Sequence, residues 1–276
     1  MTFIITLIAL MMERFFHWHH LRHWRWFLKY EQWLSMQIGR LPATLRLIIN
    51  VVPPLIVVGL IAWFVKGWFY GILQLAFGVV VLLYCLGPDN LWVQVYQNTQ
   101  DMNKEDPNLV IDRVKNDFNI ATPENAQQFH LAFVRAIFIA AHERIFSVIF
   151  WFVILGPLGA VLYRLIELFT VRTELGLDHV AGKVKSILDW LPIRVFTFLF
   201  ALGGHFREVC ATWKKDAFKG VETNESLITD CGIAALDVIE AGHLPETGEA
   251  EKEALELLDR VFVMWLVILA IVVLLT

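Results

Sequence analysis

The sequence has few charged residues for its length. Of its 276 residues, 18% are charged and 57% are hydrophobic, and the mean hydropathy is +0.58. Soluble domains contain about a quarter charged residues, so this shortage argues against a free-standing soluble enzyme and favours a protein embedded in lipid. The net charge of −4 is small and is spread along the chain. It gives no support for a nucleic acid partner, which requires a clustered basic surface.

Cysteines and known catalytic motifs are also scarce. The three cysteines are Cys85, Cys210 and Cys231, and their spacing predicts neither a disulfide framework nor a zinc site. The sequence contains no phosphate-binding loop, no dinucleotide-binding glycine pattern, no H-E-x-x-H and no G-x-S-x-G. We therefore expect isolated buried thiols and assign no catalytic residue.

Long uncharged runs are what the chain does contain. Four stretches are predicted to cross a membrane: 47–65, 67–86, 145–163 and 261–276. About 19 helical residues, at a rise of 1.5 Å each, cross a hydrocarbon core of about 30 Å. Two further stretches, 1–16 and 188–206, are marginal. The first is short, and the second carries charges at one end and is alternatively a re-entrant or buried helix.

The remaining segments also show helical patterns. Lys and Arg residues are concentrated before residue 47, and such an excess marks the cytoplasmic side of a membrane. The spans 47–65 and 67–86 then carry the chain out and back, so residues 88–144 are predicted to form a helical cytoplasmic segment. The fold class is therefore all-α, a polytopic helical membrane protein with amphipathic interfacial and cytosolic helices. We expect one domain over 1–276, multi-pass in a bacterial inner membrane, with membrane lipid as a partner.

Four histidines lie close together near the N-terminus. His19, His20 and His23 could meet on one helical face, which makes them weak candidates for a metal site. They are interleaved with Trp and Arg residues, as in a basic helix that lies in the headgroup layer. A metal site also needs ordered partners around its ligands. The pattern therefore favours an interfacial helix without a metal.

Ionisable residues at the ends of the apolar runs are the strongest candidates for function. They are Glu143, Arg144, Tyr163, Arg164, Asp189 and Arg194. A charge beside a membrane span is costly and is usually paired. One interpretation is that these charges fix the depth of the helices, and the alternative is that they converge on a polar pocket.

Several of these residues belong to a recognisable set of motifs. Phe150-Trp151, the run Gly-Pro-Leu-Gly-Ala at 156–160, Tyr163-Arg164 and the run Ile-Leu-Asp-Trp-Leu-Pro-Ile-Arg at 187–194 resemble the core shared by the AmpE proteins and the CobD/CbiB cobinamide synthases. The length and the N-terminal opening are similar to AmpE. The resemblance to the synthases implies ATP- and Mg²⁺-dependent joining of an aminopropanol to a corrin carboxylate. The resemblance to AmpE implies a role in β-lactamase regulation and peptidoglycan recycling.

The stretch before Phe150-Trp151 departs from the synthase pattern. The synthases carry an acidic and amide run of the form E-S-x-x-E-N-x-x-D there, and in residues 133–144 only Glu143 is a carboxylate. Magnesium bound with a nucleotide needs carboxylates as well as phosphate oxygens. We therefore expect no cofactor and no synthase activity, with ATP and Mg²⁺ as the alternative.

The predicted function is a regulatory or accessory one in β-lactamase induction and peptidoglycan recycling. The six residues named above would line a pocket for a small anionic ligand, such as a cell-wall fragment or a nucleotide. In that pocket Tyr163 and Arg164 would donate to the ligand and Asp189 would orient Arg194. The alternatives are a cobinamide-synthase-type ligase and a muropeptide or lipid transporter.

Overall fold

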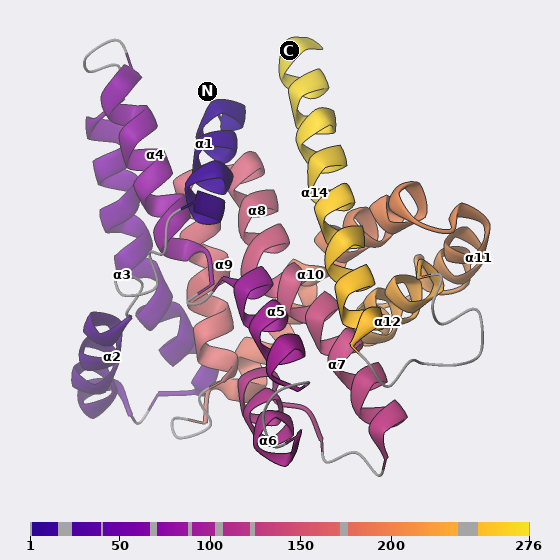
Figure 1. Ribbon diagram of the computed structural model, residues 1–276. Coiled ribbons are helices and arrows are strands. Elements are labelled where there is room, and N and C mark those ends of the chain that lie inside the picture. Colours follow the sequence, from indigo (N-terminus) through magenta and orange to yellow (C-terminus); the bar gives the residue numbers. More distant parts are fainter. Residues whose placement is uncertain are drawn as a thin grey trace. The chain divides into compact units, whose positions relative to one another are not determined.

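The computed structural model describes residues 2–15, 24–39, 41–66, 71–87, 90–102, 107–121, 125–171, 176–236 and 248–275. Within these ranges the chain is helical and has no strand, which confirms the all-α prediction (Figure 1). The sequence predicted a single domain, whereas the chain divides into two compact units. Unit 1 is Met1–Pro88 with Arg144–Asp189, and unit 2 is Asp89–Glu143 with Trp190–Thr276.

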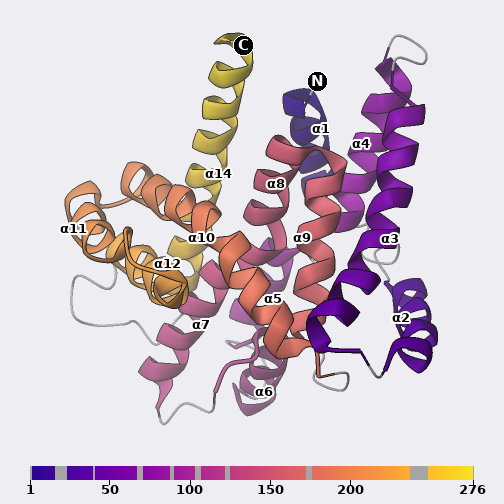
Figure 2. The same ribbon diagram turned by 180° about the vertical axis from the view of Figure 1, so that it is seen from behind.

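Unit 1 is a bundle of apolar helices. Its elements are α1 (Thr2–Phe15), α2 (Arg25–Ile38), α3 (Ala43–Phe64), α4 (Ile72–Cys85), α8 (Ser147–Leu155), α9 (Pro157–Thr170) and the first half of α10 (Asp178–Gly203). Helix α9 packs on α3, α4 and α8, and α1 packs on α4 and α8 (Figures 1 and 2). Tyr163, Leu165 and Phe169 of α9 are almost fully buried in this bundle.

A helical hairpin stands where the sequence predicted one span over 145–163. Helix α8 ends at Leu155 and α9 begins at Pro157, and the two helices lie side by side in both views (Figures 1 and 2). Gly156 has a φ of 66°, a left-handed conformation that other residues rarely adopt, and Pro157 is preset for the first position of a new helix. The predicted single span is therefore wrong, because the chain turns back at this pair.

The close approach of the two hairpin helices leaves no room for a side chain at Gly159. A Cβ atom at this position would lie 2.1 Å from the main-chain oxygen of Trp151 and 2.8 Å from Cβ of Leu155. We expect Gly159→Ala to destabilise the detergent-solubilised protein by about 1–3 kcal/mol, because backbone must move to make room. Gly182→Ala in α10 is the matched control, since a Cβ there meets nothing within 4 Å. Equal thermal unfolding temperatures for the two variants would contradict the proposed contact.

Unit 2 is built around α7 (Ala126–Ala141). Its other elements are α5 (Leu91–Asp101), α6 (Pro107–Phe118), the second half of α10, α11 (Phe206–Asp216), the 3-10 turn η4 (Val221–Thr223), α12 (Asn224–Ala234) and α14 (Glu249–Leu275). Helix α7 packs on α5, α6, α12 and α14. Aromatic rings fill the core, with centroids 5.2 Å apart for Phe138 and Phe200 and 4.7 Å apart for Phe196 and Phe200.

Within the described ranges, three helices are long and apolar enough to cross a membrane: Ala43–Phe64, Ala126–Leu155 and Asp178–Gly203. The first matches the predicted span 47–65, and the third extends the marginal stretch 188–206. The second runs through the five-residue π-helix η3 (His142–Phe146) and reaches back into 88–144, which the sequence placed in the cytoplasm. The predicted span 67–86 contains only the shorter helix Ile72–Cys85.

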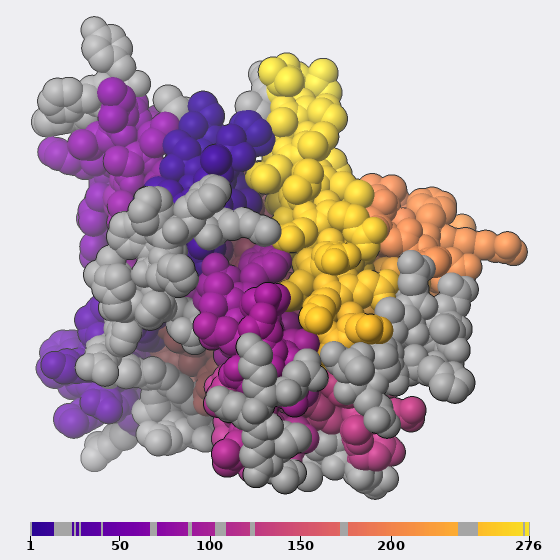
Figure 3. Space-filling model, in the orientation of Figure 1, coloured from indigo at the N-terminus to yellow at the C-terminus, as the bar shows by residue number. Residues whose placement is uncertain are grey.

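The predicted span 261–276 forms the C-terminal part of α14. This helix extends beyond the other helices of unit 2, and its last turns are prominent in the space-filling view (Figures 1 and 3). Val261 and Leu269 are buried, whereas Leu274 is 84% exposed. Exposed apolar side chains in close succession along a helix are typical of a helix end surrounded by lipid.

Candidate functional site

A polar network is buried between three helices of unit 1. The Tyr163 hydroxyl of α9 donates to Oδ1 of Asp189 in α10 over 2.7 Å, and Nζ of Lys185 donates to Oδ2 over 2.8 Å. The Ser147 hydroxyl of α8 lies 3.5 Å from Oδ1. Tyr163 and Asp189 are 1% and 4% exposed. The carboxylate therefore has a charged partner on one oxygen and hydroxyl donors on the other.

The helical repeat explains why these residues meet. Lys185 and Asp189 are four positions apart, so both side chains project from the same face of α10. Tyr163 of α9 is almost fully buried, as are Leu165 and Phe169 on other sides of this helix. The charged pair is costly to bury and is stable only because donors satisfy both carboxylate oxygens. A network of this kind holds the neighbouring helices in one arrangement.

A second ion pair follows on α9. Arg164 is 4% exposed and donates through Nη1 to Oε2 of Glu167, three positions further along the helix. Its Nε is buried and has no hydrogen-bond partner in the described part of the chain. Burying a guanidinium donor without an acceptor is unfavourable, so this nitrogen marks a place where an additional acceptor would stabilise the structure.

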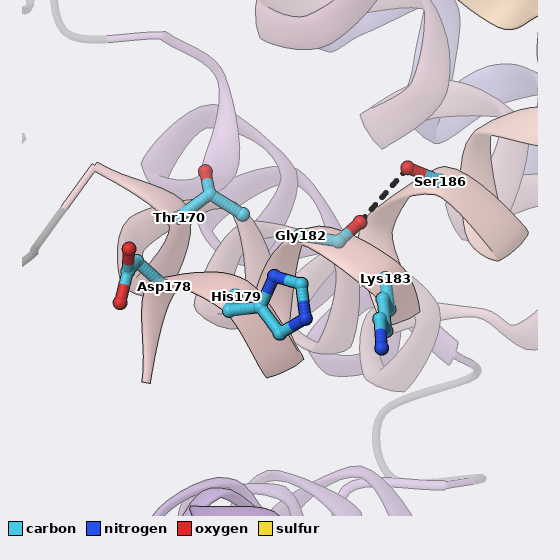
Figure 4. Close-up of a pocket in the computed structure, with 6 residues that line it drawn as sticks. All are labelled: Thr170, Asp178, His179, Gly182, Lys183 and Ser186. Atoms are coloured by element: carbon cyan, nitrogen blue, oxygen red, sulfur yellow. Dashed lines mark hydrogen bonds between the residues drawn. The ribbon is translucent and has the colours of Figure 1, made fainter. Parts of the chain in front are cut away.

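An open hollow of about 430 Å³ lies over the first turns of α10 (Figure 4). Its lining residues are polar: Thr170, Asp178, His179, Gly182, Lys183 and Ser186. His179 and Lys183 lie one helical turn apart and side by side, and the Ser186 hydroxyl donates to the Gly182 main-chain oxygen over 2.9 Å. Ser186 follows Lys185 directly and is one turn before Asp189. The hollow and the buried network therefore share α10.

Glu143 and Arg144 lie in the π-helix η3, at the boundary between the two units. The Gly87 amide donates to the Arg144 main-chain oxygen over 3.1 Å, and a Cβ on Gly87 would lie 2.8 Å from Cβ of Arg144. The stem of Arg144 therefore packs against the end of α4 in unit 1. π-Helical turns interrupt helices at a cost and are frequent at functional sites.

Arg194 has a different environment from the one the sequence suggested. It lies in unit 2, is 6% exposed, and donates to the main-chain oxygens of Trp190, Ala217, Lys219 and Gly220 over 2.9–3.2 Å. It also donates to the side chain of Asn224. All the interactions described for this guanidinium are with residues 190–224. The expected pairing with Asp189 is therefore wrong, and Arg194 acts as a clamp on the turn after α11.

Sequence reasoning thus found two members of the buried network, Tyr163 and Asp189, and missed Lys185 and Ser147. The spacing of Lys185 before Asp189 was the available signal, because oppositely charged residues four positions apart on a helix are neighbours. Glu167, three positions after Arg164, carried the same kind of signal.

The other site predictions concern metals and thiols. The candidates His19, His20 and His23 lie outside the described residues. No group of three or more His, Cys, Asp or Glu side chains suited to a metal occurs in the ranges that the structure describes. The three cysteines are free, and Cys85 and Cys231 are buried. Burial raises the pKa of the Cys231 thiol to about 12, so this thiol is unreactive at neutral pH.

The chain is similar to one known family over its whole length and to curated proteins over part of it. A model of the family described as regulatory signalling modulator protein AmpE matches residues 1–276. A relative from Chromobacterium violaceum, named cobalamin biosynthesis protein CobD, is 27% identical over 113 residues, which are 39% of this chain and 36% of that protein. A protein of the same name from Stutzerimonas stutzeri is 27% identical over 115 residues, 39% of this chain and 37% of that protein. The matches span little more than a third of each relative. No solved structure matches the chain.

Proposed function

The chain belongs to the AmpE family of regulatory signalling modulators, and from this premise we propose that it regulates β-lactamase induction and peptidoglycan recycling from the bacterial inner membrane. It does so by binding a small anionic ligand in the hollow over the first turns of α10, next to the buried network of unit 1. The observation that carries the proposal is the buried network of Tyr163, Lys185 and Asp189. Ionisable groups inside apolar helical bundles are rare, and they mark ligand or ion sites more often than they add stability.

The chemistry of the neighbouring hollow supports an anion. Lys183 and His179 offer donors on one side of α10, and Lys183 carries a positive charge at neutral pH. A carboxylate or phosphate held there would lie one to two helical turns from Asp189. Movement of α10 on binding would then be transmitted to α8 and α9 through the bonds of Asp189 to Ser147 and Tyr163. A ligand that binds one arrangement of these helices more tightly shifts the population toward it.

Replacing the exposed Lys183 with glutamine tests this site without disturbing the core. We expect Lys183→Gln to lose modulation of β-lactamase induction in a strain that lacks its own AmpE protein. Charge-assisted hydrogen bonds are worth about 1.5–3 kcal/mol, so ligand affinity should fall about tenfold or more. Lys252→Gln, which removes an exposed lysine from α14, is the control. Mass spectrometry of the extracted protein should detect a small anionic compound in the wild type that is depleted in Lys183→Gln. Normal induction by this variant would remove the hollow from the proposal.

A ligase of the cobinamide synthase type is the second candidate, because relatives named cobalamin biosynthesis protein CobD match part of the chain. In the segment that precedes Phe150-Trp151, Glu143 is the one carboxylate among residues 133–144. We expect the purified protein to form no amide between aminopropanol and a corrinoid in the presence of ATP and Mg²⁺, because that segment lacks the carboxylates that a magnesium–nucleotide complex requires. Complementation of a cobinamide-synthase-deficient strain by this chain would favour the ligase instead.

A further inference from the structure

Exposed phenylalanines lie at both ends of α11 in unit 2, and together with Trp213 between them they form what we call the aromatic surface. Phe206 at the start of α11 is 56% exposed, and Phe218 in the turn after it is 83% exposed. Helix α11 and this turn lie at the edge of the unit, in orange in the space-filling view (Figures 1 and 3). A phenylalanine that projects this far into water loses the free energy of burial, about 1.5–3 kcal/mol for a large apolar side chain. These rings therefore indicate a contact with something apolar.

The position of the rings identifies that contact. Phe198 and Leu202, on the second half of α10, are 42% and 45% exposed, and α10 is one of the helices long and apolar enough to cross a membrane. The ring of Trp213 lies 5.7 Å from that of Phe198 and 5.7 Å from that of Phe218. Through Trp213 the aromatic surface is continuous with the exposed apolar side chains of α10, so lipid around this helix would also reach Phe218.

Basic residues border this surface. Residues 206–219 contain Arg207, Lys214, Lys215 and Lys219, against the two carboxylates Glu208 and Asp216. Asp216 pairs with Lys219 over 2.5 Å, and Glu208 lies 4.0 Å from the His205 ring. Lys214 and Lys215 are exposed and precede Phe218 by one helical turn. Lysines beside aromatic rings are typical of helices that lie among anionic lipid headgroups.

The turn that carries Phe218 is also held rigidly. Arg194 binds the main-chain oxygens of Ala217, Lys219 and Gly220, on both sides of Phe218, and the Trp213 indole donates to the Arg194 main-chain oxygen over 3.2 Å. The exposure of Phe218 is therefore fixed by the fold. A rigidly presented ring has little conformational entropy to lose on insertion into lipid.

We propose that α11 and the turn after it form an interfacial anchor that inserts Phe218 and the edge of Trp213 below the headgroups of an anionic bilayer. Lys214 and Lys215 bind phosphate groups of the headgroups. The anchor is independent of the ligand site in unit 1, and it fixes the depth of the second half of α10.

Spin labelling of the full chain in nanodiscs tests the insertion. The label is placed by Phe218→Cys in a Cys210→Ser background, in which the two other cysteines are buried. In nanodiscs that contain phosphatidylglycerol, we expect the label at position 218 to collide more often with oxygen than with an aqueous nickel chelate. The ratio of the two collision rates should be several-fold higher there than at the control position Glu225→Cys, which is exposed on α12. Equal access of the nickel chelate to both positions would overturn the proposal.

The lysines test the selectivity for anionic lipid. Each lysine near a charged surface contributes about fivefold in affinity, so we expect Lys214→Gln/Lys215→Gln to weaken phosphatidylglycerol retention about twenty-five-fold in native mass spectrometry. Lys252→Gln should leave retention unchanged. If the double variant retains phosphatidylglycerol like the wild type, the lysines do not bind headgroups and that part of the proposal fails, whatever the label at position 218 reports. Because Lys183 is unchanged in these variants, failure here leaves the proposed function untouched.

Discussion

Replacing Arg194 with alanine should destabilise the protein by about 4 kcal/mol and release the turn between α11 and α12. The guanidinium satisfies four main-chain oxygens and the Asn224 side chain. Each hydrogen bond to a charged group contributes about 1.5–3 kcal/mol, and a buried acceptor left without a donor costs about 1–3 kcal/mol. Water entering the site recovers part of this sum. Denaturant unfolding of the detergent-solubilised protein, followed by circular dichroism, measures the change.

Arg194→Lys separates the charge of this residue from its geometry. The ammonium keeps the charge but has three donors on one nitrogen, and it cannot span the oxygens of Ala217 and Gly220 as the planar guanidinium does. We expect about half the loss seen for alanine. Lys215→Ala, which removes an exposed cation from α11, should change stability by less than about 0.5 kcal/mol. If Arg194→Lys is as stable as the wild type and only β-lactamase induction is lost, Arg194 would be a ligand-binding residue as the sequence suggested.

The helical repeat explains which part of the site was predictable. Asp189 and Arg194 are five positions apart, so on an α-helix their side chains point about 140° away from each other. Lys185 and Asp189 are four apart and differ by only about 40°. Applied to a helix over 188–206, this rule disfavours the pairing with Arg194. Apart from the Trp190 main-chain oxygen, the hydrogen-bond partners of Arg194 come from a turn 23 to 30 positions later. No local pattern identifies such partners.

Hydropathy predicted α3 well and the hairpin of α8 and α9 poorly, for a physical reason. Helix α3 is uncharged over the thickness of a bilayer, so length and composition suffice to identify it. The run over 145–163 has the same composition, but its direction reverses at Gly156, where one left-handed residue precedes a proline. Hydropathy averages over many residues and contains no information on one φ angle. A proline after a glycine disrupts a helix, but the extent of the reversal is set by packing of α9 on α3 and α4.

Loss of the Asp189 carboxylate should destabilise the protein about as much as loss of the Arg194 guanidinium. Asp189→Ala removes the carboxylate that accepts from the Lys185 ammonium, 15% exposed, and from the buried Tyr163 hydroxyl. Removing one member of a buried ion pair costs about 3–5 kcal/mol. Tyr163→Phe removes one hydroxyl and should cost about 1–2 kcal/mol. Because the Tyr163 hydroxyl donates to Oδ1 of Asp189, the two residues share one hydrogen bond, and Tyr163→Phe/Asp189→Ala should lose less than the sum of the single losses. Asp230→Asn, at an exposed position of α12, is the control.

Neutralising both charges separates stability from function. Lys185→Gln/Asp189→Asn keeps the shape of both side chains and allows an amide hydrogen bond with the Tyr163 hydroxyl, so no buried charge is left unpaired. Replacing a buried ion pair by neutral groups is often close to neutral for folding, and we expect this variant to unfold within about 1.5 kcal/mol of the wild type. If the charges serve only to fix the helices, β-lactamase induction should then be normal. We expect induction to be lost, because the amides replace the charge-assisted hydrogen bonds of Asp189, through which we propose that α10 acts on α8 and α9. A stable double variant with full activity would make the network a structural pair and would remove the main support for the ligand site.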